Sequence, residues 1–252
     1  MPALISVGDI IVRSLEVYKK NFRIFGDFAV WFGVLGLVQW AFAIFTESLV
    51  PDRVAAALIS RLISIPIGLV LLALLASMID VTAQAIQKKS ISLDGMIVGG
   101  IHKLLPFLWV MALTTAAVFG GLLLLVIPAL IFFVWYRFAA YFTVIDDVRG
   151  WKALKASKKI VADRFWSVVL RLALPWLFFY VLFTFAIGVL YLLLGAGLGD
   201  VGLFFGNAGN RLSISAPQSL ILMVVPQAIS GLMLPLFIAA DLHLWFDLKR
   251  TA

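Results

Sequence analysis

Ionisable residues inside apolar segments are the side chains of this chain whose chemistry is most informative. Arg137 lies nine residues after Pro128, which is about 13 Å along a helix and near the bilayer midplane if that proline marks the outer surface. A charge at that depth costs about 2.5 to 3.5 kcal/mol on insertion scales, so it should face the protein interior and pair with an acid. Asp80 and Asp241 are the candidate partners, and with Arg137 they form a predicted intramembrane polar cluster.

A second placement of these residues also fits the sequence. If the helix begins nearer Gly121, Arg137 lies toward the inner interface, where its long side chain reaches the lipid headgroups. Asp241 and His243 form a candidate proton relay, but they precede Lys249 by only eight and six residues. That spacing favours an interfacial position for both residues.

The side chains that catalytic and metal sites require are scarce. The chain has no cysteine and only two histidines, and it contains no His-Glu-x-x-His or Gly-x-Ser-x-Gly motif. Apart from the adjacent Asp146 and Asp147, no two acids stand within one helical turn of each other inside an apolar segment. We therefore expect no catalytic residues, no metal and no other cofactor.

Six apolar segments account for most of the chain. Hydrophobic residues make up 63% of its 252 residues and charged residues 13%, and the mean hydropathy is +1.11, which is far outside the range of soluble domains. The composition predicts an all-α polytopic membrane protein with six transmembrane helices in a single membrane domain, residues 1–252. The predicted segments are Phe28 to Phe45, Leu62 to Ile86, Leu104 to Leu125, Pro128 to Ile145, Phe165 to Leu194 and Gln218 to Leu248.

Lys and Arg residues lie mainly on one side of this six-segment pattern. Seventeen of the twenty lie in or next to the two terminal segments and the connections between the second and third and the fourth and fifth apolar segments, which are all on one side. Only Arg53, Arg61 and Arg211 lie in the other three connections. Because cytoplasmic loops retain Lys and Arg, both termini are predicted to be cytoplasmic. The net charge of +7 flanks membrane segments, so anionic membrane lipids are the expected partners and nucleic acid is not.

Amphipathic stretches precede the spans and suggest an internal repeat. Residues 9 to 25 and residues 150 to 168 each combine an apolar stripe with a charged one, and residues 93 to 104 form a shorter third copy. The even-numbered spans each begin near a proline. We therefore expect three hairpins, each preceded by an amphipathic interfacial helix, with chance convergence as the alternative. The predicted repeats are residues 1–90, 91–148 and 149–252.

The second amphipathic stretch is strongly basic. Its cations are predicted to bind anionic headgroups, because each cation near an anionic leaflet contributes about 1 kcal/mol. The alternative is that these cations serve only to set the topology. The predicted headgroup-binding residues are Lys152, Lys155, Lys158, Lys159 and Arg164.

Residues 128 to 166 combine a span started by proline, then an acid, a glycine, an Ala-Leu-x-x-Ser helix and aromatic residues that re-enter the membrane. This pattern resembles a prokaryotic family of membrane domains found fused to glycerophosphodiester phosphodiesterases, together with stand-alone relatives of unknown function. The resemblance implies a prokaryotic inner-membrane location and a structural motif, and the phosphodiesterase domain itself is absent. The matching residues are Pro128, Asp146, Gly150, Ala153, Leu154, Ser157, Phe165 and Trp166.

These features favour a non-enzymatic membrane protein that acts in lipid or envelope organisation as a scaffold or partner subunit, with a membrane protein as possible partner. The alternative is transporter-like or channel-like passage of a small molecule or lipid, and the third option is an intramembrane enzyme. A polar vestibule lined by Asp80, Arg137 and Asp241 would favour passage, whereas a dry centre would favour a scaffold.

Overall fold

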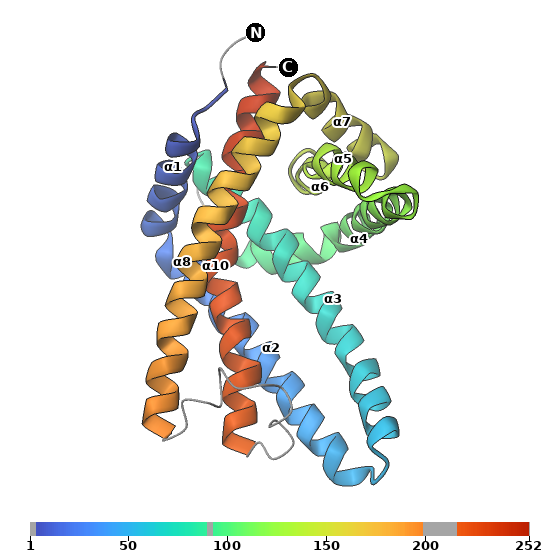
Figure 1. The fold of residues 1–252 in the computed structure, drawn as a ribbon, viewed down its shortest axis with the longest axis vertical. Helices are drawn as coiled ribbons and strands as arrows, with labels where there is room; N and C mark the ends of the chain where they lie inside the picture. Colours follow the sequence, from blue (N-terminus) through green and yellow to red (C-terminus); the bar gives the residue numbers. More distant parts are fainter. Residues whose placement is uncertain (1–3, 90–92, 199–215, 252) are drawn as a thin grey trace.

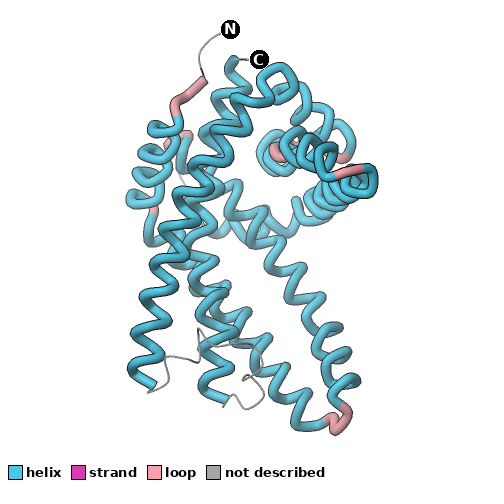
Figure 2. The backbone as a smooth tube through the Cα atoms, in the orientation of Figure 1, coloured by secondary structure: helices cyan, strands magenta, loops and turns pink. Residues whose placement is uncertain are grey.

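The computed structural model of the protein describes residues 4–89, 93–198 and 216–251, and every regular element in those ranges is a helix (Figure 1 and Figure 2). This confirms the all-α fold. The elements are α1 (Val7–Lys20), α2 (Phe22–Leu49), α3 (Arg53–Ile86), α4 (Leu93–Leu124), α5 (Val126–Tyr136), α6 (Ala139–Asp146), α7 (Trp151–Val161), the 3-10 helix η1 (Ala162–Arg164), α8 (Phe165–Leu198) and α10 (Ala216–Thr251).

Six helical stretches of the described chain are long and apolar enough to cross a membrane, so the protein is a multi-pass membrane protein. α3 and α8 contain 34 residues each, which corresponds to about 51 Å against a hydrocarbon core of about 30 Å. These helices therefore tilt or extend beyond the hydrocarbon. The third amphipathic stretch, residues 93 to 104, is the first part of α4 and not a separate helix.

The prolines occupy different positions from those expected at the starts of the spans. Pro128 is the third residue of α5, where a missing N–H costs little. Pro66 and Pro226 instead lie well inside α3 and α10. α3 begins at Arg53, nine residues before the predicted Leu62, because Asp52 caps it by accepting hydrogen bonds from Val54 and Ala55 at 2.7 and 3.2 Å. α10 begins at Ala216, two residues before the predicted Gln218.

Small residues bring α2 and α10 close together along their length. A Cβ atom at Gly231 would lie 2.9 Å from the Cα of Ala29, and one at Gly36 would lie 3.1 Å from the side chain of Gln227. Close approach of this kind lets membrane helices gain packing contacts where no hydrophobic driving force exists between them. α10 also packs against α1, α3 and α8, so it is the central helix of the fold (Figure 1).

The fourth apolar segment is broken into α5 and α6 at Arg137 and Phe138, without a proline or glycine at the break. Ser157 of α7 supplies hydrogen-bond partners for two backbone groups at this break. Its hydroxyl accepts a hydrogen bond from the Phe138 N–H at 3.1 Å and donates one to the Trp135 carbonyl at 2.6 Å. Buried backbone groups need such partners, so the break and the docking of α7 depend on each other.

The face of α7 that carries Ser157 is buried against α5 and α6. Ala153, Leu154, Ser157 and Val161 are fully inaccessible. The apolar side of this amphipathic helix therefore contacts protein, and its charged side faces outward. Gly150, with φ of 57°, makes the turn that leads into α7, a backbone conformation that other residues rarely adopt.

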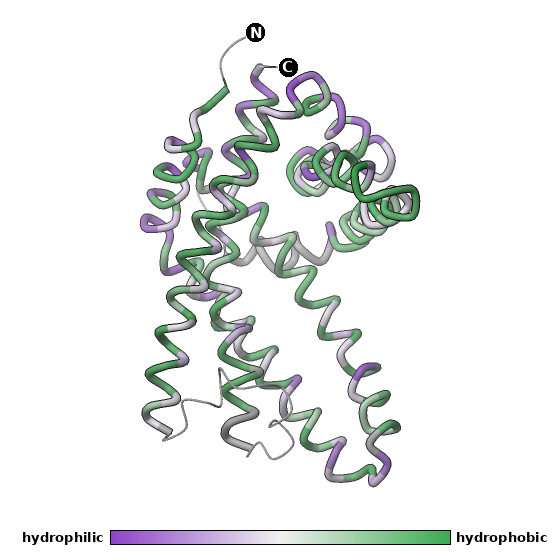
Figure 3. Tube along the Cα trace, viewed as in Figure 1, coloured by the Kyte–Doolittle hydropathy of each residue, from purple (hydrophilic) through white to green (hydrophobic). Residues whose placement is uncertain are grey.

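Charged side chains tie the two termini together at one end of the molecule, where most hydrophilic residues gather (Figure 3). Arg171 donates to the Ile5 carbonyl at 2.7 Å, and Asp247 accepts from the Ile5 N–H at 2.8 Å. Arg164 donates to the hydroxyl and the carbonyl of Thr251 at 2.6 and 2.9 Å. This end is consequently held by hydrogen bonds as well as by packing.

Replacing Ser157 by Ala should lower the free energy of unfolding by about 1 to 3 kcal/mol, because two backbone groups at the α5–α6 break lose their partner. The measurement is thermal or denaturant unfolding of the purified protein in detergent. Ser167→Ala on the exposed side of α8 is the matched control, and it should change stability by less than about 0.5 kcal/mol. Equal stability of the two variants would contradict the assigned role of Ser157.

Candidate functional site

A buried ion pair joins the α5–α6 junction to α10. The Arg137 guanidinium donates to the Asp241 carboxylate from Nε at 3.0 Å and from Nη2 at 2.7 Å. The Asp241 side chain is 1% exposed and the Arg137 side chain 25% exposed. Asp241 precedes Arg250 by nine residues, which places the pair about 14 Å along α10 from the charged end of that helix.

Two aromatic residues donate further hydrogen bonds to Asp241. The Tyr141 hydroxyl donates to Oδ2 at 2.8 Å, and the Trp176 indole N–H donates to Oδ1 at 2.8 Å. The carboxylate therefore accepts four hydrogen bonds from α6, α8 and the α5–α6 junction. A buried ion pair is tolerated when its remaining hydrogen-bonding capacity is met in this way.

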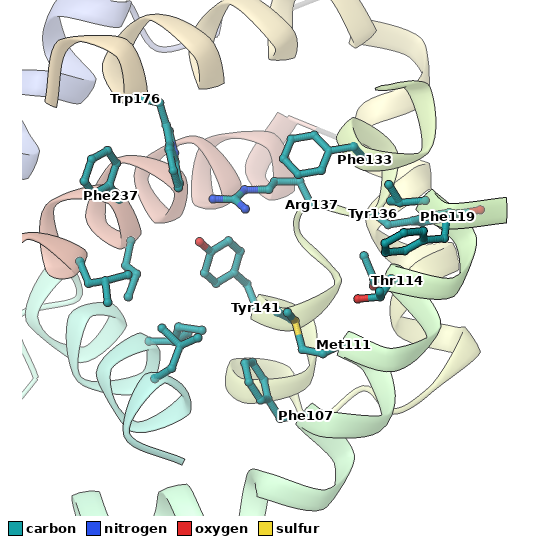
Figure 4. A pocket seen from close by; sticks show the side chains of 17 residues that line it. Phe107, Met111, Thr114, Phe119, Phe133, Tyr136, Arg137, Tyr141, Trp176 and Phe237 are labelled. Atoms are coloured by element: carbon teal, nitrogen blue, oxygen red, sulfur yellow. The ribbon is translucent and has the colours of Figure 1, made fainter. Parts of the chain in front are cut away.

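Trp176 of α8 contacts both members of the ion pair. While its N–H binds Asp241, its ring lies 4.6 Å from the Arg137 guanidinium carbon, within the range of a cation–π interaction. The same ring packs against Phe237 of α10 at a centroid distance of 4.5 Å. Figure 4 shows Trp176 and Tyr141 on either side of the guanidinium.

An apolar cavity of about 420 Å³ adjoins the ion pair (Figure 4). Side chains of α3, α4, α5, α6, α8 and α10 line it, and nearly all of them are aliphatic or aromatic. The exceptions are the Arg137 guanidinium and the hydroxyl groups of Tyr136, Tyr141, Thr114 and Thr115. The volume lies in the usual range of small-molecule sites, about 300 to 1,000 Å³.

The structure separates Asp80 from the other two residues of the predicted cluster. Asp80 forms an ion pair with Lys103 at 3.4 Å and accepts a hydrogen bond from Gln84 at 3.2 Å. Arg137 and Asp241 are brought together without it. His243, the other member of the candidate relay, has a buried Nε2 atom with no hydrogen-bond partner among the described residues.

The predicted headgroup-binding cations fall into two groups. Lys158 lies over the Trp135 ring, with its ammonium 4.1 Å from the centroid, and Arg164 binds Thr251. Lys152, Lys155 and Lys159 are exposed at positions i, i+3 and i+7 of α7, on the side opposite its buried residues. Within the described part of the chain, these three lysines form neither an ion pair nor a ring contact, whereas Lys158, which is also exposed, lies over Trp135.

Sequence reasoning missed Tyr141 and Trp176, and it named Ser157 only as part of the Ala-Leu-x-x-Ser pattern, without its hydrogen bonds to the helix break. The first two carried a usable signal, because a tyrosine or tryptophan in an apolar segment has a polar atom that needs a partner when it is buried. Ser157 gave no such signal by itself. Its function depends on a helix break that neither proline nor glycine marks.

Among residues 4–89, 93–198 and 216–251, no three His, Asp or Glu side chains gather as a metal site would require. In comparisons with known proteins, no family model, no curated protein and no solved structure matches this chain.

Single substitution of Arg137 by Met, or of Asp241 by Leu, should lower the free energy of unfolding by about 3 to 5 kcal/mol, because each leaves a buried charge unpaired. The double variant should be less destabilised than the sum of the single ones, with a coupling of at least about 0.5 kcal/mol in a double-mutant cycle. The control is the exposed pair Arg149 and Asp147, both 66% exposed, whose coupling should stay within about 0.5 kcal/mol of zero. Additive effects of Arg137 and Asp241 would show that their contact is energetically unimportant.

Proposed function

We propose that this chain is a non-enzymatic protein of the prokaryotic inner membrane that acts in lipid or envelope organisation, as a scaffold or as a subunit of a membrane complex. The observation that carries the proposal is the exposed basic face of α7, formed by Lys152, Lys155 and Lys159. We call these three residues the α7 basic face. Its proposed ligands are anionic lipid headgroups.

The way α7 is attached supports this function. Its opposite face, with Leu154 and Ser157, is buried in the protein, so the three lysines are held on a fixed support. Pre-organised cations lose less freedom on binding than cations of an unstructured loop. At about 1 kcal/mol each, three cations contribute enough to retain a lipid or to orient the protein at an anionic surface.

The finer architecture belongs to the same proposal. We place α1 and α7 at the inner membrane interface, with both termini cytoplasmic, and we treat the spans as three hairpins. α1 has Lys19 and Lys20 exposed in its last turn, and Trp151 and Trp166 are exposed at the first residue of α7 and near the start of α8. Tryptophan and lysine in such positions are typical of the boundary between lipid and water.

The cavity favours this function over passage of a hydrophilic solute. A permeation path needs polar groups along its length, but Asp80 does not line the cavity and Asp241 is enclosed by its four donors. The remaining wall is apolar. An apolar cavity of this kind gives a hydrophilic solute no row of polar partners, so it favours the scaffold over passage.

The resemblance of residues 128 to 166 to the membrane domains fused to phosphodiesterases also supports the proposal. The residues of the shared pattern have structural roles here: Ala153, Leu154 and Ser157 dock α7, and Gly150 makes the turn before it. A relationship to stand-alone members of that family is consistent with a protein that organises lipid and does not cleave it.

The orientation can be tested with single cysteines, because the chain contains none of its own. Ala162 and Ser48 are exposed at opposite ends of the molecule, near η1 and at the end of α2. In intact cells, Ala162→Cys should resist a membrane-impermeant thiol reagent until the membrane is opened, and Ser48→Cys should react at once. Labelling of both from the same side would rule out the proposed topology.

Replacing all three residues of the α7 basic face by Gln should reduce retention of phosphatidylglycerol or cardiolipin by about tenfold or more, since each cation contributes about 1 kcal/mol. Native mass spectrometry of the purified protein measures the bound lipid. The control is a triple variant with the same change in net charge, Lys19→Gln, Lys20→Gln and Lys89→Gln, at exposed positions on other elements. Equal lipid loss in both variants would mean that α7 has no special role.

A further inference from the structure

We propose that the cavity beside Arg137 holds one acyl chain of a membrane glycerolipid, and that the ester carbonyl of that chain accepts a hydrogen bond from Arg137 Nη1. This site is separate from the α7 basic face, so it goes beyond headgroup binding. Its two components are the largely apolar wall and the Arg137 guanidinium.

The wall of the cavity matches a hydrocarbon chain. Leu75, Met111 and Phe237 are among its lining residues, and they come from three different helices. Three further lining residues, Phe119, Phe133 and Trp176, are themselves 62%, 48% and 36% exposed, so the cavity opens at the surface of the spans. The material outside that opening is lipid. An acyl chain can therefore enter from the side without crossing a polar barrier.

The guanidinium supplies the only cationic donor in the wall. Arg137 uses Nε and Nη2 for Asp241, and none of the described residues accepts a hydrogen bond from Nη1. The Arg137 side chain is 25% exposed, and Arg137 is one of the residues that line the cavity. An unmade hydrogen bond from a charged group in an apolar site is costly, so a ligand acceptor at this point gains free energy.

The charge of the site selects the type of acceptor. Asp241 already neutralises Arg137, so a carboxylate or phosphate would add an unbalanced negative charge to an apolar environment. An ester carbonyl accepts the hydrogen bond without adding charge. The pair also lies about 14 Å along α10 from Arg250, away from the charged end of that helix, which suits a lipid ester better than a lipid phosphate.

The test uses the full chain in nanodiscs of phosphatidylglycerol that contain a small fraction of photoreactive phosphatidylglycerol with a diazirine in one acyl chain. Two probes are compared, one with ester-linked and one with ether-linked chains, because the ether lacks the carbonyl. Adducts are mapped by mass spectrometry. The ester probe should label Phe107 to Phe119 of α4 about fivefold more than the ether probe does, whereas the exposed α8 residues Leu177, Val181 and Phe185 should show no preference.

Two variants separate the wall from the donor. Ala140→Phe fills the cavity from α6 and should abolish the preferential α4 adducts, and Ala41→Phe on the exposed side of α2 is its matched control. Arg137→Met combined with Asp241→Asn removes both charges, so it should keep labelling of α4 but eliminate the difference between ester and ether probes.

Three outcomes would overturn the proposal. These are α4 labelling no higher than that of the lipid-facing part of α8, equal labelling by the two probes in the unsubstituted protein, and labelling that persists in Ala140→Phe. The triple Gln variant of the α7 basic face should retain the cavity adducts. If the cavity is not labelled but the α7 basic face still retains lipid, this site fails and the proposed function stands. If the cavity is labelled but the α7 basic face retains no lipid, the proposed function fails and this site stands.

Discussion

A charged pair in an apolar interior is the constraint on which the arrangement of four elements depends. Arg137 and Asp241 can be enclosed only if the carboxylate finds further donors, and these come from Tyr141 of α6 and Trp176 of α8. The break between α5 and α6 places Arg137 directly after the end of one helix and Tyr141 at the third residue of the next. Ser157 then satisfies the backbone groups that the break exposes, which fixes α7 as well.

The amphipathic pattern of α7 does not by itself tell whether lipid or protein covers the apolar face of the helix. The same stripe of Leu154 and Val161 can be satisfied by lipid or by protein, because both are apolar. Here protein covers it, and the small side chains of Ala153 and Ser157 allow the close approach to α5 and α6. The charged face therefore belongs to a helix that is packed against protein, and not to one that is held only by lipid.

Hydropathy predicted six apolar helices because burial of backbone in lipid requires long apolar runs, and that requirement is visible in composition alone. The cost of a buried charge likewise predicted that Arg137 needs an acid. Which acid it meets depends on the relative rotation and depth of helices, and periodicity within one helix contains no such information. Asp80 pairs with Lys103 instead. The break at Phe138 was unpredictable for a related reason: its stabilising partner, Ser157, lies 19 residues further along the chain.

Stability alone does not account for the ion pair. Well-packed apolar residues of similar volume often stabilise a protein as much as a buried ion pair does, or more. An apolar contact could therefore have joined α5, α6, α8 and α10 equally well. Tyr141 and Trp176 would then not need to donate hydrogen bonds. The ion pair instead leaves one guanidinium nitrogen beside a 420 Å³ apolar cavity, and a purely apolar junction would lack that donor. The proposed hydrogen bond to a lipid ester would account for both the ion pair and the apolar cavity next to it.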